Sequence, residues 1–537
     1  MALGACNFLL SLPLGTPNLD TREEDRDAEG NVDSRDIEVR RAGQRHLAEA
    51  GLANRYFHNV SATILWGDPF FRSFPDVLSF ALALQLSAVR GGLIAGDAVK
   101  RLALPAIPAW SVGGPQLLSN LVTGIAAACG RGLRTLRLDS TGDAISNDGL
   151  AAVFATCRHL TALRISVRLG ADEAEGSHSE DDDDDDDDRA PSPAAPTNAE
   201  ETNASEHMNL EPNVYDVLVS GIARLNIFDL AGLCSSTRKA TASFLAIIRA
   251  GIAAPLRVLC LGAFEDAVGS HTQGYDLAAL LTTAAARCSH LEVLQVLLPD
   301  ERPAGMEALT DALKALPGSC SRLHTVAIRH RPRPYGTATQ PYSAGDYPVS
   351  YVSALRPALR QLVIGLPNLA RLDLQGVEAD EKVVHGLAVR APATLHTLLM
   401  DTDACPPPQL LHLIVRRGAQ LRRLSLISVV HHPTHQLLAA IAAKCVELVD
   451  LRLWLKAPDS TESLRQLEFM FPDKWIAALK ETLRRCPKLT RVGLSWVPST
   501  EYTDAVIELD SEYPGLIDWG TFPATARCLP TTGYPEW

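Results

Sequence analysis

The nine residues CVELVDLRL (445–453) are one copy of a pattern that recurs along the chain and decides its fold. Four other stretches follow the same pattern C-x-x-L-x-x-L-x-L, some with Val or Ile at its last two apolar positions: CRHLTALRI (157–165), CSHLEVLQV (288–296), CSRLHTVAI (320–328) and CPKLTRVGL (486–494). The frame recurs without its cysteine in GRGLRTLRL (130–138), AAPLRVLCL (253–261), LPNLARLDL (366–374), PATLHTLLM (392–400) and GAQLRRLSL (418–426), and more weakly in IARLNIFDL (222–230). These eleven units indicate a repeat protein.

The distance between units supports this interpretation. The first leucines of successive units lie 27 residues apart from Leu133 to Leu160, and then 26, 26 and 27 apart along Leu369, Leu395, Leu421 and Leu448. Structural repeats of about 20–29 residues occur as stacked strand and helix units. The longer steps elsewhere are expected to be the same repeat carrying loop insertions.

Each unit predicts one strand and one helix. The spacing L-x-x-L-x-L places leucines on one side of a short strand. Apolar residues recur at three and four positions in 146–157, 435–445 and 472–486, which predicts a helix before the strand, with Ser146 as an N-cap in the first. The cysteine at the helix end is expected to act as a small buried hydrophobe. Because one unit cannot bury its apolar side alone, we expect an α/β solenoid with a curved parallel sheet inside and helices outside.

The pattern and its cysteine resemble the cysteine-containing class of leucine-rich repeats. That class is similar to the substrate-binding half of F-box/leucine-rich-repeat proteins, especially the fungal ones. The repeats extend over roughly 115–500. The resemblance implies a solenoid that binds a protein substrate and carries out no catalysis of its own.

An N-terminal region carries the second part of this resemblance. Residues 46–84 contain apolar residues spaced for short helices and the stretch NVSATILW (59–66). This region looks like the second half of a fungal F-box, which implies contacts with the adaptor of an SCF-type ubiquitin ligase through Leu47, Leu52, Phe57, Val60, Leu65 and Trp66. A departure lies at its front, because Leu12-Pro13 stands 53 residues before Trp66 with a polar, acidic stretch between them. The alternative is that 46–84 is only a helical cap over the open end of the solenoid.

Charge is concentrated in one insertion. Residues 171–211 hold sixteen acidic residues and one basic residue, a net charge of −15, so the remainder of the chain carries −13 + 15 = +2. Its eight consecutive aspartates (181–188) repel one another and predict a disordered surface loop. Near-neutral charge elsewhere gives no indication of nucleic-acid binding.

The expected domains follow from these patterns. Residues 1–45 form a charged, disordered arm, 46–114 an F-box-like region and N-terminal cap, 115–500 the solenoid with its insertion at 171–211, and 501–537 a C-terminal cap and tail. No apolar run is long enough for a membrane span. Cysteines that follow the repeat, with no C-x-x-C pair, favour a reducing compartment, cytoplasmic or nuclear.

No residue set indicates an enzyme, a cofactor or a metal. No phosphate-binding loop is present, and His431, His432 and His435 lack cysteine or carboxylate partners at ligand spacing. Arg329, Arg331 and Arg333 are interpreted as a small basic cluster in a loop.

The residues that alternate with the strand leucines are the candidate binding residues, because they point away from the core. They form a row of mixed charge: Thr135, Arg137, Asp139, Arg164, Ser166, Gln295, Arg371, Asp373, Gln375, Thr397, Asp401, Arg423, Ser425, Asp450, Arg452, Trp454, Arg491 and Ser495. We expect Arg371, Asp373, Arg423, Asp450, Arg452, Trp454 and Arg491 to contact a protein substrate, with Arg423, Arg452, Trp454 and Arg491 as one patch. The expected function is a substrate receptor of an SCF-type ubiquitin ligase. The alternative is a leucine-rich-repeat scaffold that does not bind the ligase adaptor.

Overall fold

The computed structural model describes residues 66–69, 71, 74–89, 95–104, 115–139, 147–166, 212–230, 238–262, 273–298, 306–330, 349–402, 405–427, 434–454, 472–494 and 503–518. Within these residues, one parallel sheet of 13 strands follows the order of the sequence from β1 to β13. Its strands are β1 (Arg101–Leu104), β2 (Thr135–Asp139), β3 (Ala162–Ser166), β4 (Ile227–Leu230), β5 (Val258–Leu261), β6 (Val293–Leu298), β7 (Thr325–His330), β8 (Arg371–Glu378), β9 (Thr397–Asp401), β10 (Arg423–Ile427), β11 (Asp450–Trp454), β12 (Arg491–Leu494) and β13 (Ile517–Asp518).

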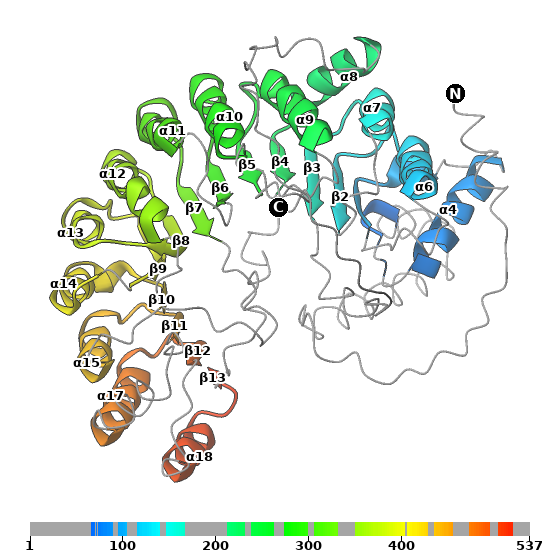
Figure 1. Cartoon of the computed structure of the whole chain (residues 1–537). Helices are drawn as coiled ribbons and strands as arrows, with labels where there is room; N and C mark the ends of the chain where they lie inside the picture. Colours follow the sequence, from blue (N-terminus) through cyan, green and yellow to red (C-terminus); the bar gives the residue numbers. More distant parts are fainter. Residues whose placement is uncertain are drawn as a thin grey trace, which may run out of the picture.

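Helices cover one side of this sheet. They are α4 (Phe74–Val89), α5 (Ala95–Ala98), α6 (Pro115–Ala128), α7 (Asn147–Thr156), α8 (Pro212–Ile222), α9 (Arg238–Gly251), α10 (Gln273–Arg287), α11 (Met306–Ser319), α12 (Val349–Gly365), α13 (Glu381–Arg390), α14 (Pro407–Arg417), α15 (Thr434–Lys444), α17 (Pro472–Arg485) and α18 (Thr503–Glu512), with a short 3-10 turn η2 (Gly418–Gln420). Figure 1 shows the strands along the inner side of a wide arc and helices α6 to α18 along its outer side. The predicted α/β leucine-rich-repeat solenoid is therefore the observed fold.

The eleven sequence units supply strands β2 to β12. The weak unit at 222–230 forms β4, which pairs in parallel with β3 and β5. The three helices predicted in 146–157, 435–445 and 472–486 are α7, α15 and α17, whereas Ser146 lies outside the described residues.

Columns of aliphatic side chains between sheet and helices form the core. Leu398 lies between Leu372 and Leu424 in the parallel register, and all three are at most 2% exposed. Burial of one leucine side chain contributes about 2 kcal/mol. Repetition of such columns along the arc stabilises a sheet whose individual strands are too short to be stable alone.

The cysteine slot links neighbouring units. The thiols of Cys157, Cys288 and Cys320 donate to backbone carbonyls of the preceding unit, at Ala126 (3.3 Å), Ala253 (3.2 Å) and Cys288 (3.5 Å). The described cysteines are buried and unbridged. Burial raises the pKa of Cys445 to about 12 and that of Cys486 to about 11. The predicted role as a small core residue is thus supported, with a weak polar contact added.

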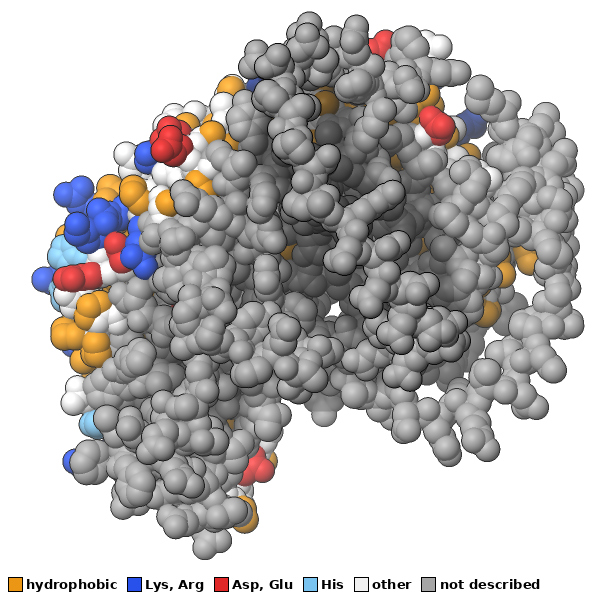
Figure 2. Space-filling model, in the orientation of Figure 1, with side chains coloured by type: hydrophobic (Ala, Val, Ile, Leu, Met, Phe, Trp, Pro, Cys, Tyr) orange, Lys and Arg blue, Asp and Glu red, His pale blue; other side chains and the backbone are white. Residues whose placement is uncertain are grey.

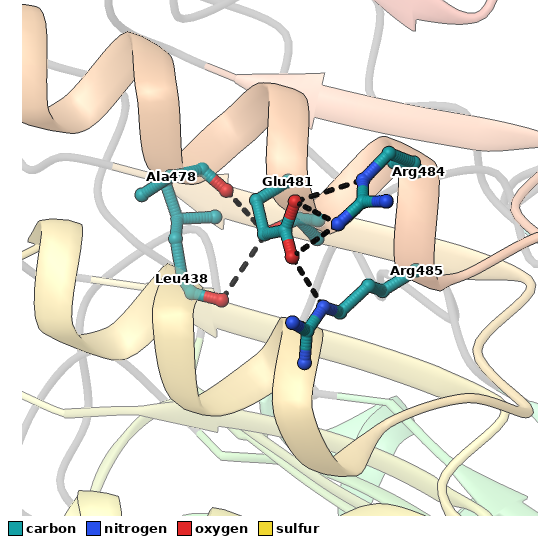
Figure 3. Close-up of polar contacts among 6 residues, drawn as sticks. Leu438, Ala478, Glu481, Arg484 and Arg485 are labelled. Carbon is teal, nitrogen blue, oxygen red and sulfur yellow. Dashed lines mark hydrogen bonds and ion pairs between the residues drawn. The ribbon is translucent and has the colours of Figure 1, made fainter.

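Helices pack on their neighbours through a few specific polar contacts. The Thr482 hydroxyl of α17 donates to the carbonyl of Leu438 in α15 (3.1 Å) and to that of Ala478 in its own helix (2.8 Å). On the outer side of α17, Glu481 accepts from Arg484 (2.8 Å) and from Arg485 (Figure 3). Asp380 caps α13 by accepting from the Val383 amide (2.8 Å) and pairs with Arg360 of α12 (3.2 Å).

The sheet extends beyond the predicted solenoid limits of 115 and 500 at both ends. Strand β1 pairs with β2, and its unit contains Val99, Leu102 and Leu104, which are buried like the repeat leucines. Strand β13 pairs with β12 through only two residues. The pattern search missed both ends because Val99 replaces the first leucine at one end and the other end has no L-x-x-L-x-L spacing.

Candidate functional site on the inner face of the sheet

The inner face of the sheet consists of the strand residues that alternate with the buried leucines. The register aligns Arg371, Thr397, Arg423, Asp450 and Arg491 across β8 to β12, and we call this row column one. Two residues along each strand, column two contains Asp373, Leu399, Ser425, Arg452 and Gly493. Because adjacent strands lie about 4.8 Å apart, the residues of one column form a continuous surface.

The C-terminal part of this face carries the predicted charged patch. Arg423, Asp450 and Arg491 are direct neighbours in column one. Arg452 donates to both carboxylate oxygens of Asp450, at 3.1 and 3.2 Å. Trp454 lies beside Ile427 in the backbone register, but its side chain is outside the described part of the structure.

Asp373 is the most buried charged residue of the inner face. It is 0% exposed and accepts two hydrogen bonds from Arg329, at 3.0 and 2.5 Å, while Arg371 lies 3.6 Å away. The interpretation of Arg329 as a loop residue is wrong, because β7 continues to His330 and places Arg329 on the inner face. The alternation Val326, Ile328 and His330 was the signal that could have extended this strand.

An apolar patch on the inner face was missed by the sequence analysis. Val258, Cys260 and Val293 form a hydrophobic cluster separate from the core, with Ile227 packed against it. They lie on β4 to β6, and Cys260 aligns with Gln295, which is 8% exposed. The sequence could have predicted this cluster, because these strands carry aliphatic residues both at the core positions and at the positions that alternate with them.

Some buried polar atoms of the inner face have no hydrogen-bond partner in the described part of the chain. They are Oδ1 of Asp373, Nε2 of Gln375 and Oγ of Ser425, and both Asp373 and Ser425 are at most 4% exposed. A buried polar atom without a partner costs about 1–3 kcal/mol. These atoms therefore mark a place where a bound molecule would gain hydrogen bonds.

Positive charge collects at the edge of the sheet where strands β7 to β10 begin. The backbone carbonyl of His324 accepts from Ala370 and Arg371, and that of His396 accepts from Arg422 and Arg423. Burial, followed by the charges of Arg422, Arg423, Arg371 and His324, lowers the pKa of His396. The lowered pKa therefore has burial as its main cause, and the neighbouring cations add to it.

In the N-terminal part of the inner face, over β2 to β4, the structure describes fewer of the predicted binding residues. Arg164 pairs with Asp229 at 4.0 Å, and Arg137 is its neighbour on β2. Thr135 begins β2, whereas the side chains of Asp139 and Ser166 and all of Ser495 lie outside the described residues. Asp401 ends β9 beside Ile427.

Most of the predicted adaptor-binding residues cannot be placed. Leu47, Leu52, Phe57, Val60 and Leu65 lie outside the described residues. Trp66 is half-buried and stacks near Phe80 of α4, with ring centroids 5.4 Å apart. Phe71 packs edge-on against the ring of Phe80 with centroids 5.0 Å apart, so Trp66 lies against a small aromatic cluster that packs on the core. Its contact with an adaptor stays a prediction.

The outer helical surface differs from the inner face. Around α12 to α14, Figure 2 shows Lys, Arg, Asp, Glu and His side chains interspersed with hydrophobic ones. Val389 and Val415 are 53% and 50% exposed there, and the rings of His385 and His412 stack at 6.2 Å. This mixed surface offers matched positions for control variants.

The described residues include no group of three or more His, Cys, Asp or Glu side chains arranged to hold a metal ion. Of the predicted histidine cluster, only His435 is among them. No described helix has the length and apolar character needed to span a bilayer.

Comparisons with protein families and with curated proteins find no match. Among solved structures, the chain is similar to the yeast complex of Rad7 and Elc1, with a TM-score of 0.40 and 12% identity over 87% of this chain and 94% of that chain. It is also similar to the leucine-rich-repeat-containing protein LegL7 from Legionella pneumophila, with a TM-score of 0.31 and 13% identity over 77% of this chain and 98% of that chain. The chain's own strand order, register and leucine columns show that its fold is a leucine-rich-repeat solenoid.

Proposed function

We propose that this protein is a non-catalytic binding protein whose inner face holds a protein partner. The observation that carries the proposal is the cluster of Arg423, Arg452 and Arg491 on the three adjacent strands β10 to β12, with Arg423 and Arg491 in column one and Arg452 in column two. Arginine and aromatic residues are enriched among the residues that dominate protein interfaces.

The inner face also has the geometry of a large interface. Columns one and two continue over neighbouring strands in parallel register, so a partner can contact many strands at once. Raised thiol pKa values, about 12 for Cys288 and about 11 for Cys320, keep these cysteines protonated at neutral pH and unsuited to nucleophilic catalysis.

A capture experiment with a matched control tests this proposal. Cross-linked partners of the intact chain are compared with those of an Arg423→Ala, Arg491→Ala variant and an Arg484→Ala, Arg485→Ala variant. The control arginines are 69% and 53% exposed on the outer helix α17. Partners that disappear only from the inner-face variant support the proposal, and partners retained by both variants contradict it.

The more specific proposal is that the protein is the substrate receptor of an SCF-type ubiquitin ligase. It rests on the resemblance of 46–84 to part of an F-box and on the packing of Trp66, Phe71 and Phe80 within the described end of that region. The alternative is a leucine-rich-repeat scaffold whose cap only covers the end of the solenoid.

Binding of the purified ligase adaptor separates these two functions. Trp66 supports the cap, so the variant to use is Leu52→Asp, Phe57→Asp, with Val389→Asp on the exposed side of α13 as its control. Adaptor binding by the intact chain and the control, lost in the double variant with the thermal transition retained, is the expected result. An intact chain that does not bind the adaptor would leave the scaffold function.

A further inference from the structure

We propose that the inner face over β8 to β12 binds an extended acidic segment of a partner protein, with a carboxylate at every third residue. This inference rests on the proposed function, because it assigns a chemistry to the same surface. Three features carry it: the spacing of the cations in column one, the engagement of the nearby acids, and the buried polar atoms that have no partner.

Cations recur on every second strand of column one. The order is Arg371, Thr397, Arg423, Asp450 and Arg491 across β8 to β12. With adjacent strands about 4.8 Å apart, successive arginines are roughly 10 Å apart. A polyproline II segment rises about 3.1 Å per residue with three residues per turn, so every third side chain lies on one face, about 9 Å from the last. A segment lying across the strands therefore presents carboxylates at nearly the spacing of the arginines.

Two acids of this surface, Asp373 and Asp450, are engaged by arginines outside column one, and Asp373 also pairs with Arg371 of column one. Asp450 accepts from Arg452 at 3.1 and 3.2 Å, and Asp373 accepts from Arg329 at 3.0 and 2.5 Å. Over β7 to β12 the inner face holds five arginines (Arg329, Arg371, Arg423, Arg452, Arg491) and four acids (Asp373, Glu378, Asp401, Asp450), so its net charge is 5 − 4 = +1. Column one by itself holds three arginines and one aspartate, so its net charge is 3 − 1 = +2. Arginine presents five donors, so those of column one can engage a ligand in addition to their neighbours.

The buried polar atoms without partners need hydrogen-bonding groups, and the backbone of an extended segment has such groups available. Oδ1 of Asp373 needs a donor, and Oγ of Ser425 can donate or accept, in column two beside the cation row. A polyproline II backbone makes no internal hydrogen bonds, so its N–H and carbonyl groups are available. Leu399 lies between Asp373 and Ser425 in the register and supplies an apolar contact.

The distribution of charge favours carboxylates over a phosphate. A phosphate group is a concentrated double negative charge and is bound where several arginines converge on one point. Here the arginines of column one are separated by Thr397 and by Asp450, which would repel a dianion. Carboxylates that each carry a single charge and stand apart along a segment match the spaced arginines better than one phosphate does.

Three fluorescein-labelled peptides test the inference against the full chain by anisotropy. The first repeats Glu-Pro-Ala, the second has the same composition with its glutamates contiguous, and the third has Gln in place of Glu. We expect the Glu-Pro-Ala repeat peptide to bind with the highest affinity and the Gln peptide with the lowest. The affinity of the Glu-Pro-Ala repeat peptide should fall as the salt concentration rises. Arg423→Ala should weaken the first peptide about tenfold, the loss of one charge-assisted contact. Arg416→Ala, on the exposed side of α14, should leave its affinity unchanged.

The outcomes separate this inference from the proposed function. If Gln and Glu peptides bind equally and Ser425→Trp abolishes both, the inner face binds protein but the acidic assignment is wrong. If the contiguous peptide binds as tightly as the spaced one, the three-residue spacing is wrong. A phosphoserine peptide that binds where the glutamate peptide does not would also overturn it. Absence of binding by every peptide, with captured partners retained by the Arg423→Ala, Arg491→Ala variant, overturns both proposals.

Discussion

At the scale of single residues, the recurring cysteine connects a unit to the unit before it. Its side chain is small enough for the helix end to turn into the strand, and its thiol reaches a carbonyl of the preceding unit in Cys157, Cys288 and Cys320. The cysteine is buried at this position in all five units that carry it, as Cys157, Cys288, Cys320, Cys445 and Cys486. Serine at this position would bury a more strongly polar group, and alanine would leave a small cavity.

We predict that the free energy of unfolding falls as pH rises above about 9. Burial raises the thiol pKa from 9.0 to about 12 in Cys288 and Cys445, and to about 11 in Cys320 and Cys486. Between these values the unfolded chain releases protons that the folded chain keeps, so ionisation favours unfolding. The contribution is therefore fully present below pH 9 and is lost as pH rises toward 11 and 12.

Urea unfolding at pH 7, 9 and 10 measures this decline. Lysine and tyrosine groups also titrate at high pH, so the matched control is a Cys288→Ala, Cys445→Ala variant. Its unfolding free energy should be lower at pH 7 but should fall less between pH 9 and 10. An equal fall in both proteins would show that the thiols do not contribute.

At the scale of the elements, side chains on the inner face connect neighbouring strands by contacts that lie outside the hydrophobic core. Asp373 of β8 binds Arg329 of β7, although the two residues are 44 positions apart in the chain. The parallel register brings Ala327 opposite Asp373, and Arg329 reaches the carboxylate from two residues further along β7. The same strand carries a positive φ of 70° at Gly376, within the irregular register between Leu374 and Glu378. A residue with a Cβ would be strained at Gly376.

We predict that Asp373→Ala lowers the free energy of unfolding by about 3 kcal/mol, because it leaves a nearly buried arginine without its carboxylate. Asp450→Ala removes a carboxylate that is 19% exposed, whereas Asp373 is fully buried, so we expect a smaller loss of about 1–2 kcal/mol. Chemical denaturation of both variants measures the difference. Equal losses would show that burial does not set the strength of these pairs.

The predictability of the site from sequence is limited at this scale. Alternation with leucines was enough to assign Arg371, Arg423, Asp450 and Arg491 to one face, and the register places them in one column. Arg329 was missed because its strand extends past the pattern. The apolar cluster at Val258 and Val293 was missed because only polar and aromatic residues between the leucines were taken as candidate binding residues.

At the scale of the whole molecule, stability is the sum of similar contacts between successive units. Each strand from β2 to β12 pairs with the strands before and after it in sequence, and the two end strands β1 and β13 lie at opposite ends of the sheet (Figure 1). Such solenoids tolerate changes in the number of units.

We therefore predict that deletion of residues 396–421 gives a folded protein. The deletion joins Leu395 to Arg422 and removes β9 and α14 as one 26-residue unit, so the spacing of the remaining leucines is kept. Circular dichroism should show unchanged helix content per residue and a cooperative thermal transition at somewhat lower temperature. The matched control, deletion of 396–408, removes half a unit and should abolish the cooperative transition. Two equally disrupted proteins would contradict independence of the units.

The sequence by itself determined the repeating unit, its strand positions and its buried columns, because these depend on spacing within about nine residues. Leu133, Cys157 and Leu448 could be placed in the core without knowledge of any distant contact. Only the tertiary structure decided which inner-face residues become neighbours, such as Arg329 and Asp373, and where the sheet begins and ends at β1 and β13. The physical reason is that insertions of variable length separate the units, so contacts between strands depend on how whole units stack and not on any local pattern.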